Sequence, residues 1–348
     1  MPYLALQFSA LVVGLLAANR NRMLTYSTGV LVLLAFAAIA GLRGTVGTDT
    51  ATYISLVSLV MSDAQIAIEP GFLAFIKLAS LLTNNPSTVV NLFSAMFFAV
   101  MLLFMFRATK LELIYLFSYF APQYFLLYSM NGIRIGLASA FFLLFFQGWT
   151  RGNKLQAILV GAVAISFHFS ILLAFVLFFF GRSSRSSHRS LSGQLIVIAL
   201  LSIGSMALND YLISQFDRYS GSRTFSEAAG LSIFIKSFVF LVFAGATPLP
   251  QKKRLRATII AAFAVIFSMG VTQFTYAGLR LLDIVAWMLP LLYMGSLDPN
   301  QRIGKRFVLG LLLVGMLGGA ATTRNIFSSV DEGASPFIPY KFYWEASN

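Results

Sequence analysis

The stretch that organises the chain is Leu42-Arg43-Gly44-Thr45-Val46-Gly47-Thr48-Asp49, which follows the apolar run 23–41. Its glycines and threonines predict a tight, non-helical backbone. A new helix would begin at about Thr50, with Thr48 or Asp49 as its cap. The stretch therefore places a guanidinium, a carboxylate and backbone N–H groups at the end of an apolar helix, which suits an anionic ligand. The alternative is an ordinary polar loop that caps a helix.

Composition indicates the class of protein. Of the 348 residues, 58% are hydrophobic and 11% are charged, 35 are Phe, and the mean hydropathy is +0.81. A soluble domain carries about 25% charged residues, so the sequence predicts an all-α polytopic membrane protein. The chain has no cysteine and only two histidines, His168 and His188, which excludes disulfides and a His-rich metal site. We attribute the formal charge of +13 to membrane topology and not to nucleic-acid binding.

Apolar runs of bilayer length mark the predicted membrane helices, because about 20 helical residues cross about 30 Å of hydrocarbon. A further apolar stretch, Leu155–Phe180, is interrupted around His168 and predicts two short helices that meet there. Together they predict about twelve crossings in a single membrane domain over residues 1–348, with the first run retained and not cleaved as a signal peptide. The runs are Leu4–Ala18, Leu24–Leu42, Ser87–Phe106, Leu111–Ser129, Ile133–Trp149, Leu191–Leu208, Leu231–Ala246, Ala257–Tyr276, Leu281–Ser296 and Phe307–Ala321.

The positive-inside rule assigns the two sides of the membrane. It predicts that both termini and the segments 43–86, 209–230 and 322–348 lie outside, with His168 near the outer face. By the same rule Glu69–Thr83 is not a span, and we interpret it as an amphipathic helix on the outer surface. The short basic connections expected inside contain Arg20/Arg22, Arg107/Lys110, Arg151/Lys154, Arg182/Arg185/Arg189, Lys252/Lys253/Arg254/Arg256 and Arg302/Lys305/Arg306.

Several ionisable residues lie at outer helix ends or in apolar surroundings, where a charge is costly unless it faces a polar cavity or a partner. Arg134 follows the turn signal Asn131-Gly132 and either faces a ligand or snorkels at the interface. Arg280 either binds a ligand or pairs with Asp283 along one helix. The full set is Arg43, Asp49, Arg134, His168, Arg280, Asp283 and Arg324.

His168 and Asp49 are the candidate general bases. His168 lies between Phe167 and Phe169. As a histidine it would be able to take a proton near neutral pH, unless it only makes structural hydrogen bonds. A carboxylate near Arg43 is a weaker base, so Asp49 would instead hold that guanidinium or bind hydroxyl groups.

Two outer segments mix cations, hydroxyls and aromatics, a pattern that suits stacking on sugar rings. For residues 342–344 an interfacial aromatic belt is the favoured alternative. The excess of outer arginines implies a polyanion, and phosphate fits the guanidinium fork best. Because the chain has no Walker motif and no Asp-x-Asp cluster, the phosphate would arrive on a lipid. The two segments are Asp217-Arg218-Tyr219-Ser220-Gly221-Ser222-Arg223 and Tyr340-Lys341-Phe342-Tyr343-Trp344.

Five motifs, taken in order, resemble the EpsG-like branch of the Wzy polysaccharide polymerases. They are Arg43-x3-Gly47-Thr48-Asp49-x3-Tyr53, Asn131-x2-Arg134-x3-Ala138, Phe167-His168-x-Ser170, Arg280 in a late span, and Pro339-Tyr340. Two positions depart from the family pattern: Thr50 stands where an aromatic is usual, and Ile135 where a glutamine is usual.

The resemblance implies a GT-C-like glycosyltransferase of the bacterial inner membrane with a periplasmic active site and no cofactor. It would polymerise oligosaccharide repeat units carried on undecaprenyl diphosphate into O-antigen or a similar glycan. A protein that sets chain length is a further partner that the resemblance allows. The alternative function is a transporter or flippase of lipid-linked sugars, although many transporters carry internal repeats that are not visible here.

The predicted site follows from the residues and the resemblance together. His168 and Asp49 are assigned to catalysis. Arg43, Arg134 and Arg280 are assigned to the diphosphate. The second-rank diphosphate residues are Arg218, Arg223 and Arg324, and the sugar-binding residues are Tyr53, Asn131, Asp217, Tyr219 and Tyr340.

Overall fold

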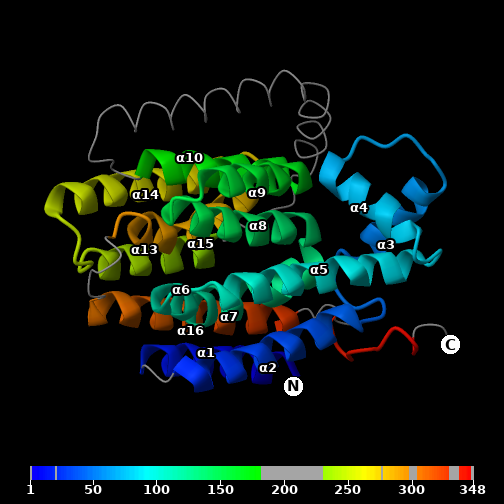
Figure 1. The fold of residues 1–348 in the computed structure, drawn as a ribbon, viewed down its shortest axis with the longest axis horizontal. Helices are drawn as coiled ribbons and strands as arrows, with labels where there is room; N and C mark the ends of the chain where they lie inside the picture. The colour runs from blue at the N-terminus through cyan, green and yellow to red at the C-terminus, as the bar shows by residue number, and fades with distance from the viewer. Residues whose placement is uncertain are drawn as a thin grey trace. The chain divides into compact units, whose positions relative to one another are not determined.

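The computed structural model describes residues 2–19, 22–181, 230–275, 277–297, 304–328 and 337–345. In these ranges the regular structure is helical apart from one isolated bridge (Figure 1). The chain divides into two compact units: residues 1–169 with 315–348, called unit 1, and residues 170–314, called unit 2. The single membrane domain expected from the sequence stays a prediction.

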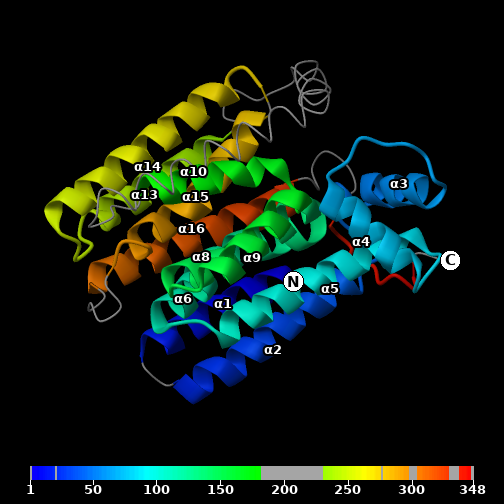
Figure 2. The same ribbon diagram turned by 45° about the horizontal axis from the view of Figure 1, so that its top comes forward.

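Long apolar helices build the core of unit 1. Helices α1 (Pro2–Ala18), α2 (Arg22–Gly41), α5 (Pro86–Phe106) and α8 (Ile133–Thr150) pack in sequence on one another, and Figure 2 shows α2 alongside α5. The start of α5 is fixed by Asn85, whose Oδ1 accepts from the backbone N–H of Ser87 at 2.9 Å. A cap of this kind contributes about 1 kcal/mol to the stability of a helix.

The run predicted over Leu111–Ser129 is a helical segment with two wide turns. It contains α6 (Lys110–Tyr115), the π-helical turn η1 (Leu116–Phe120), α7 (Ala121–Leu126) and the π-helical turn η2 (Leu127–Asn131). Pro122 follows η1 and has no backbone N–H to donate, so the wide turn accommodates it. The part of α16 (Lys305–Ser328) from Gly315 onward packs here, because a Cβ at Gly315 would overlap the carbonyl of Ser118.

The helix break predicted at His168 is confirmed. Helix α9 (Lys154–Phe167) returns alongside α8, and His168 then adopts extended backbone with φ −162° and ψ 118°. The turn η3 (Phe169–Ile171) and α10 (Leu172–Gly181) follow. The predicted membrane side of His168 stays a prediction.

Two shorter helices lie between α2 and α5 in the sequence. Helix α3 (Thr50–Met61) and helix α4 (Pro70–Ser80) gather at the end of unit 1 that is drawn on the right in Figure 1. Helix α4 buries Phe72, Ile76 and Ala79 and leaves Lys77 exposed, which confirms the amphipathic helix expected there.

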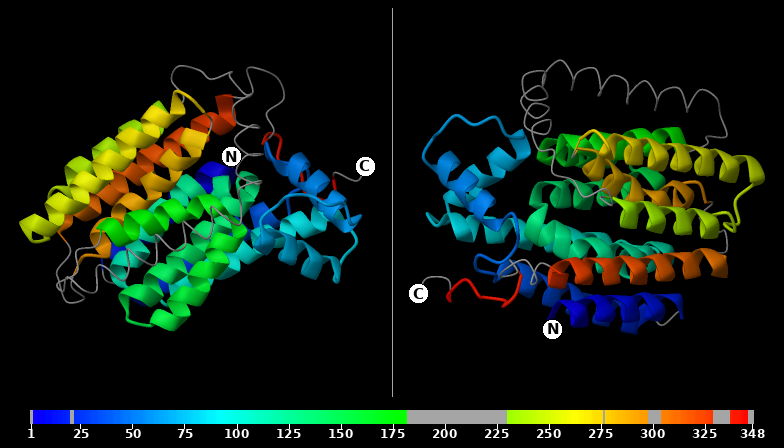
Figure 3. Two further views of the ribbon diagram at one scale, coloured as in Figure 1. Left: turned by 90° about the horizontal axis from the view of Figure 1, so that it is seen from above. Right: turned by 180° about the vertical axis from the view of Figure 1, so that it is seen from behind.

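Unit 2 contains α10, α13 (Leu231–Ala244), α14 (Gln251–Thr272), α15 (Ala277–Met294) and the first part of α16. Helix α15 is its centre, because α10, α13 and α14 all pack on it and it buries Trp287 and Tyr293. The yellow α14 runs beside α15 in Figure 3.

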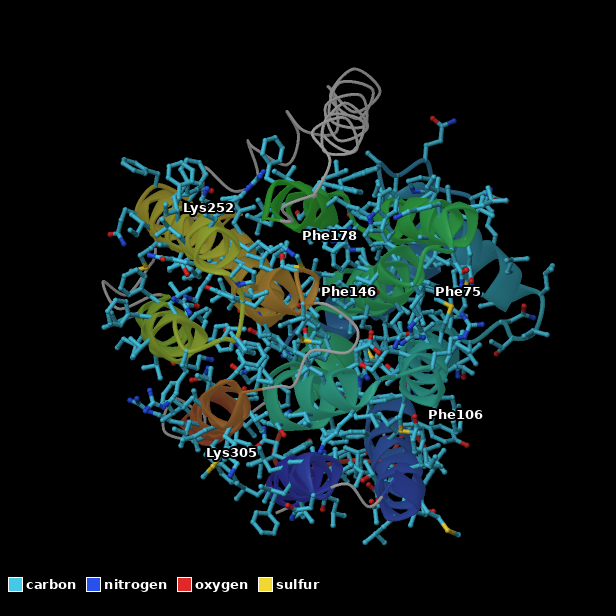
Figure 4. All side chains as sticks on the ribbon, turned by 60° about the vertical axis from the view of Figure 1, so that its left-hand side comes forward. Phe75, Phe106, Phe146, Phe178, Lys252 and Lys305 are labelled. Carbon is cyan, nitrogen blue, oxygen red and sulfur yellow. The ribbon has the colours of Figure 1, made fainter. Side chains whose placement is uncertain are left out.

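Exposed apolar side chains identify a membrane protein. Phe106 of α5 is 59% exposed and lies on the outside, whereas Phe146 of α8 is buried (Figure 4). Large exposed apolar surfaces on long helices are expected in lipid and costly in water. Six helices in the described residues are long and apolar enough to span a bilayer: Met23–Gly41, Pro86–Phe106, Ile133–Thr150, Gln251–Thr272, Ala277–Met294 and Lys305–Phe327.

The protein is therefore an all-α, multi-pass membrane protein. The shorter runs Leu4–Ala18 and Leu231–Ala246 also form helices, α1 and α13, and the run Leu191–Leu208 lies outside the described residues. The number of about twelve crossings stays a prediction.

Candidate functional site

The stretch from Leu42 to Asp49 forms the non-helical turn that its sequence predicts. Gly47 has a φ of 113°, which side-chain-bearing residues rarely adopt. Helix α3 then begins at Thr50 with Asp49 in the cap position, but the Asp49 side chain makes no capping hydrogen bond. Thr50 Oγ1 instead donates to the Val46 carbonyl at 2.7 Å, which closes the turn.

Arg43 is fully buried, with 0% of its surface exposed. Its NH1 group donates to the Ala40 carbonyl at 2.7 Å, to Ser94 Oγ at 2.9 Å and to the Ser129 carbonyl at 2.8 Å. Its Nε and NH2 groups are buried without a hydrogen-bond partner. Burial lowers the pKa of the guanidinium to about 10. Arg43 therefore joins α2, α5 and η2, and its predicted role with a diphosphate stays a prediction.

The C-terminal segment pairs with the same stretch. The N–H of Gly44 donates to the Lys341 carbonyl at 2.9 Å, and the N–H of Tyr343 donates to the Leu42 carbonyl at 3.0 Å. The hydroxyl of Tyr340 donates to the Ile39 carbonyl at 2.8 Å, and burial raises the pKa of this hydroxyl to about 12. The first and the last motif of the chain are thus in contact.

The Asn131-Gly132 turn also packs against the stretch. A Cβ at Gly47 would lie 2.9 Å from Asn131 Oδ1, an atom that is buried and accepts no hydrogen bond. Tyr53 is also buried, and its ring lies 6.0 Å from that of Phe72 in α4. Asn131 and Tyr53 therefore lie next to the organising stretch, and their predicted contacts with sugar stay predictions.

Glu69, Arg134 and His168 form one charged cluster. Glu69 is 0% exposed; its Oε2 lies 2.6 Å from Arg134 NH1 and its Oε1 lies 2.7 Å from His168 Nδ1. The side chains of Arg134 and His168 keep 23% and 17% of their surface exposed. We call these three residues the Glu69 cluster.

Local sequence explains the position of each member of the cluster. Glu69 precedes Pro70 in the N-cap position of α4, with the extended backbone (φ −62°, ψ 138°) that a following proline favours. Arg134 is in the first turn of α8, and His168 ends α9. Gly71 lets the start of α4 approach the end of α9, because a Cβ there would overlap Ser166.

The cluster keeps the Glu69 carboxylate ionised. Burial by itself would raise the pKa of Glu69, but the hydrogen bond from His168 and the positive charge of Arg134 outweigh it and lower that pKa to about 2. A buried acid with both oxygens engaged satisfies the condition under which buried charges persist. Near neutral pH the carboxylate is therefore a hydrogen-bond acceptor only.

Other predicted residues lie elsewhere. Arg280 is in unit 2, where Asp283 interacts electrostatically with both Arg280 and Lys236. Arg324 is exposed on α16. Asp49 is partly exposed and makes no salt bridge with Arg43, so the expectation that it holds this guanidinium is wrong. Asp217, Arg218, Tyr219 and Arg223 lie outside the described residues.

Sequence reasoning missed Glu69, which it placed only at the edge of an amphipathic surface helix. The available signal was the pair Glu69-Pro70 in front of an apolar helix, in a chain with only 12 acidic residues. In the part of the chain that the structure describes, no three His, Cys, Asp or Glu side chains group as they would around a metal ion. The cluster can instead move a proton at an imidazole and hold an anion at a guanidinium.

Long lipid-facing helices with a buried charge cluster at one end define a polytopic membrane protein with a polar site. Comparison with protein-family models shows that the chain belongs to the EpsG family, whose model matches residues 27–342. This match confirms the resemblance to the EpsG family, and the family is associated with exopolysaccharide biosynthesis. Neither a curated protein nor a solved structure matches the chain.

Proposed function

We propose that the protein polymerises lipid-diphosphate-linked oligosaccharide repeat units by glycosyl transfer. The observation that carries this proposal is the Glu69 cluster, in which one carboxylate contacts both an imidazole and a guanidinium. Glycosyl transfer from a lipid diphosphate needs both chemistries: a base for the attacking hydroxyl and a cation for the departing phosphate. Membership of the EpsG family supports the class of substrate.

In the proposed reaction, a sugar hydroxyl of one repeat unit attacks the anomeric carbon of the growing chain. A bond forms between this carbon and the hydroxyl oxygen, while the bond from the carbon to the phosphate oxygen breaks. The electron pair leaves with undecaprenyl diphosphate. The hydroxyl proton passes to Nε2 of His168, and Arg134 stabilises the charge on the phosphate.

The cluster lies at the end of unit 1 expected to face outward. The start of α8 and the end of α9 meet there, whereas the α8–α9 turn with Arg151 and Lys154 lies at the opposite end. Basic connections mark the cytoplasmic side, so the reaction would take place at the periplasmic face. Asp49, Tyr53, Asn131 and Tyr340 are proposed to contact sugars, and Arg134 is proposed to contact the diphosphate. The diphosphate roles of the fully buried Arg43 and of Arg280 in unit 2 stay separate predictions.

The test is a His168→Gln variant expressed in cells that lack the chromosomal copy. Glutamine keeps hydrogen bonding but cannot take the proton, so we expect normal membrane levels and a loss of at least about 100-fold in polymer. His188→Gln, the variant of the second histidine, is the matched control and should make normal polymer. Normal polymer from His168→Gln at normal levels would contradict the role of His168 as the base.

The deletion strain itself separates polymerase from transporter. Without a polymerase, single repeat units still reach the outer surface, because another protein moves them there. Without a transporter, no repeat unit reaches that surface. Labelling surface glycans in the deletion strain should therefore reveal single units, and a surface devoid of them would favour the transporter.

A further inference from the structure

We infer that Glu69 is a positioning residue that fixes the tautomer of His168, so that Nε2 is the nitrogen that receives the proton. This inference rests on the proposed function for its catalytic meaning, but the tautomer itself can be measured without any reaction. The sequence motifs described above assign no role to this glutamate.

The geometry determines which nitrogen carries the hydrogen. Glu69 Oε1 lies 2.7 Å from His168 Nδ1, which is a hydrogen-bond distance. An ionised carboxylate only accepts, so Nδ1–H must donate. A neutral imidazole has one protonated nitrogen, and Nε2 then carries the lone pair.

The carboxylate is held rigidly in place. Pro70 fixes the first residue of α4, and Gly71 packs against Ser166, two residues before His168. The ring of Phe72 lies 4.4 Å from that of Phe93 in α5, which packs the first turn of α4 against α5. Because α4 and α9 meet through the cluster, the orientation of the imidazole is set by packing and not by a mobile loop.

The positive charge of Arg134 helps to keep the Glu69 carboxylate ionised, and so it also affects the tautomer of His168. Its NH1 group lies 2.6 Å from Glu69 Oε2, and its guanidinium lies 5.8 Å from the centre of the Phe72 ring. Without this cation, only the interaction with His168 would oppose burial, which favours the protonated acid. A protonated carboxyl can donate to Nδ1 and so reverse the tautomer. Glu69 therefore couples the phosphate-binding arginine to the base.

The charged groups on the surrounding elements are few. Helices α3 and α5 contain no charged residue, and Arg134 is the one on α8. On α4, Lys77 is exposed, and on α9, Lys154 lies 3.8 Å from the ring centre of Trp149, at the far end of the helix. Of the charged groups near this site on the described helices and their caps, Glu69 contacts His168 directly and Arg134 contacts Glu69.

The first experiment reads the tautomer by NMR of the full chain in micelles, with nitrogen-labelled histidine in a His188→Gln background that leaves one imidazole. We expect Nδ1–H in the parent protein near pH 8. In Glu69→Gln we expect a mixture of tautomers and a titration midpoint lower by about one pH unit, because a carboxylate at this distance favours the charged ring. Glu69→Asp should restore the parent pattern in part.

Glu112→Gln is the matched control. Glu112 is also buried and lies 2.6 Å from an arginine, Arg151, at the opposite end of unit 1. Its variant loses a comparable ion pair, so it should lose stability without changing the His168 signals. Identical tautomer and midpoint in the parent protein and Glu69→Gln would overturn the inference.

The second experiment measures polymerisation by the reconstituted chain against pH. Glu69→Gln should lower kcat by about 100-fold or more with KM changed by less than about threefold, and the pH of half-maximal rate should fall by about one unit. If the tautomer changes as expected but His168→Gln polymerises normally, the proposed base is wrong while the positioning stands. If the rate falls without a change in the NMR signals, the positioning is wrong.

Discussion

Replacing Gly47 by alanine should destabilise the protein through two separable effects. At a φ of 113°, a Cβ is strained against the backbone, at a cost of about 1–2 kcal/mol. The new Cβ would also lie 2.8 Å from Thr50 Oγ1 and 2.9 Å from Asn131 Oδ1, closer than ordinary contact. Such overpacking costs about 1–3 kcal/mol, so the total loss in the free energy of unfolding is about 2–5 kcal/mol.

Gly152 offers a matched control for this prediction. Its φ is 90°, yet a Cβ there would meet nothing within 4 Å. Gly152→Ala should therefore lose only the backbone cost of about 1–2 kcal/mol. The unfolding of both variants in detergent can be followed by tryptophan fluorescence under identical conditions. The free energy of unfolding of Gly47→Ala should be lower than that of Gly152→Ala by about 1–3 kcal/mol. Equal losses would refute the claim that the stretch packs tightly on the Asn131 turn.

Three further predictions concern stability and topology. Arg43→Ala should lower the free energy of unfolding by about 3–5 kcal/mol, because it leaves a cavity and removes the NH1 hydrogen bonds. The exposed Arg324→Ala should change the free energy of unfolding by no more than about 0.5 kcal/mol. Similar losses for the two variants in the same unfolding assay would contradict the structural role of Arg43. Glu69 has a pKa of about 2 against an ordinary 4.5, so its contribution to stability is full above pH 4.5 and is lost as pH falls toward 2. The stability difference between the parent protein and Glu69→Gln should therefore shrink over that pH range, and a constant difference would exclude the ion pair as its cause. Reporter fusions at Ser186 and at the C-terminus should report opposite sides of the membrane, and matching sides would contradict the predicted topology.

Much of the fold was predictable because hydrophobic periodicity and local turn chemistry act within a few residues. The apolar runs in the described residues form helices close to their predicted bounds, such as Pro86–Phe106 for the run Ser87–Phe106. The polar interruption at His168 breaks the helix where the sequence indicates. Gly47 likewise lies in the predicted turn, where the backbone has a positive φ that favours glycine.

What the sequence could not predict depends on contacts between distant residues. The π-helical turns on either side of α7 follow from how the backbone accommodates Pro122 and the turn at Gly132, and apolar periodicity does not report them. The pairing of Leu42–Gly44 with the segment around Lys341 joins residues that lie about 300 positions apart in the sequence. A bridge this short has no strand pattern of its own.

Arg43 and Arg134 show what the sequence alone could not distinguish. Arg43 and Arg134 carry the same signal, a guanidinium beside a turn at the outer end of an apolar run, and the sequence assigned both to a diphosphate. Packing separates them: Arg43 is enclosed by neutral carbonyl and hydroxyl oxygens, whereas Arg134 remains partly exposed and finds Glu69, 65 residues away. A buried carboxylate needs partners for both of its oxygens, and the two oxygens of Glu69 contact Arg134 and His168. A charge at the end of a membrane helix therefore indicates that a partner exists, and helix packing decides whether that partner is the protein itself or a ligand.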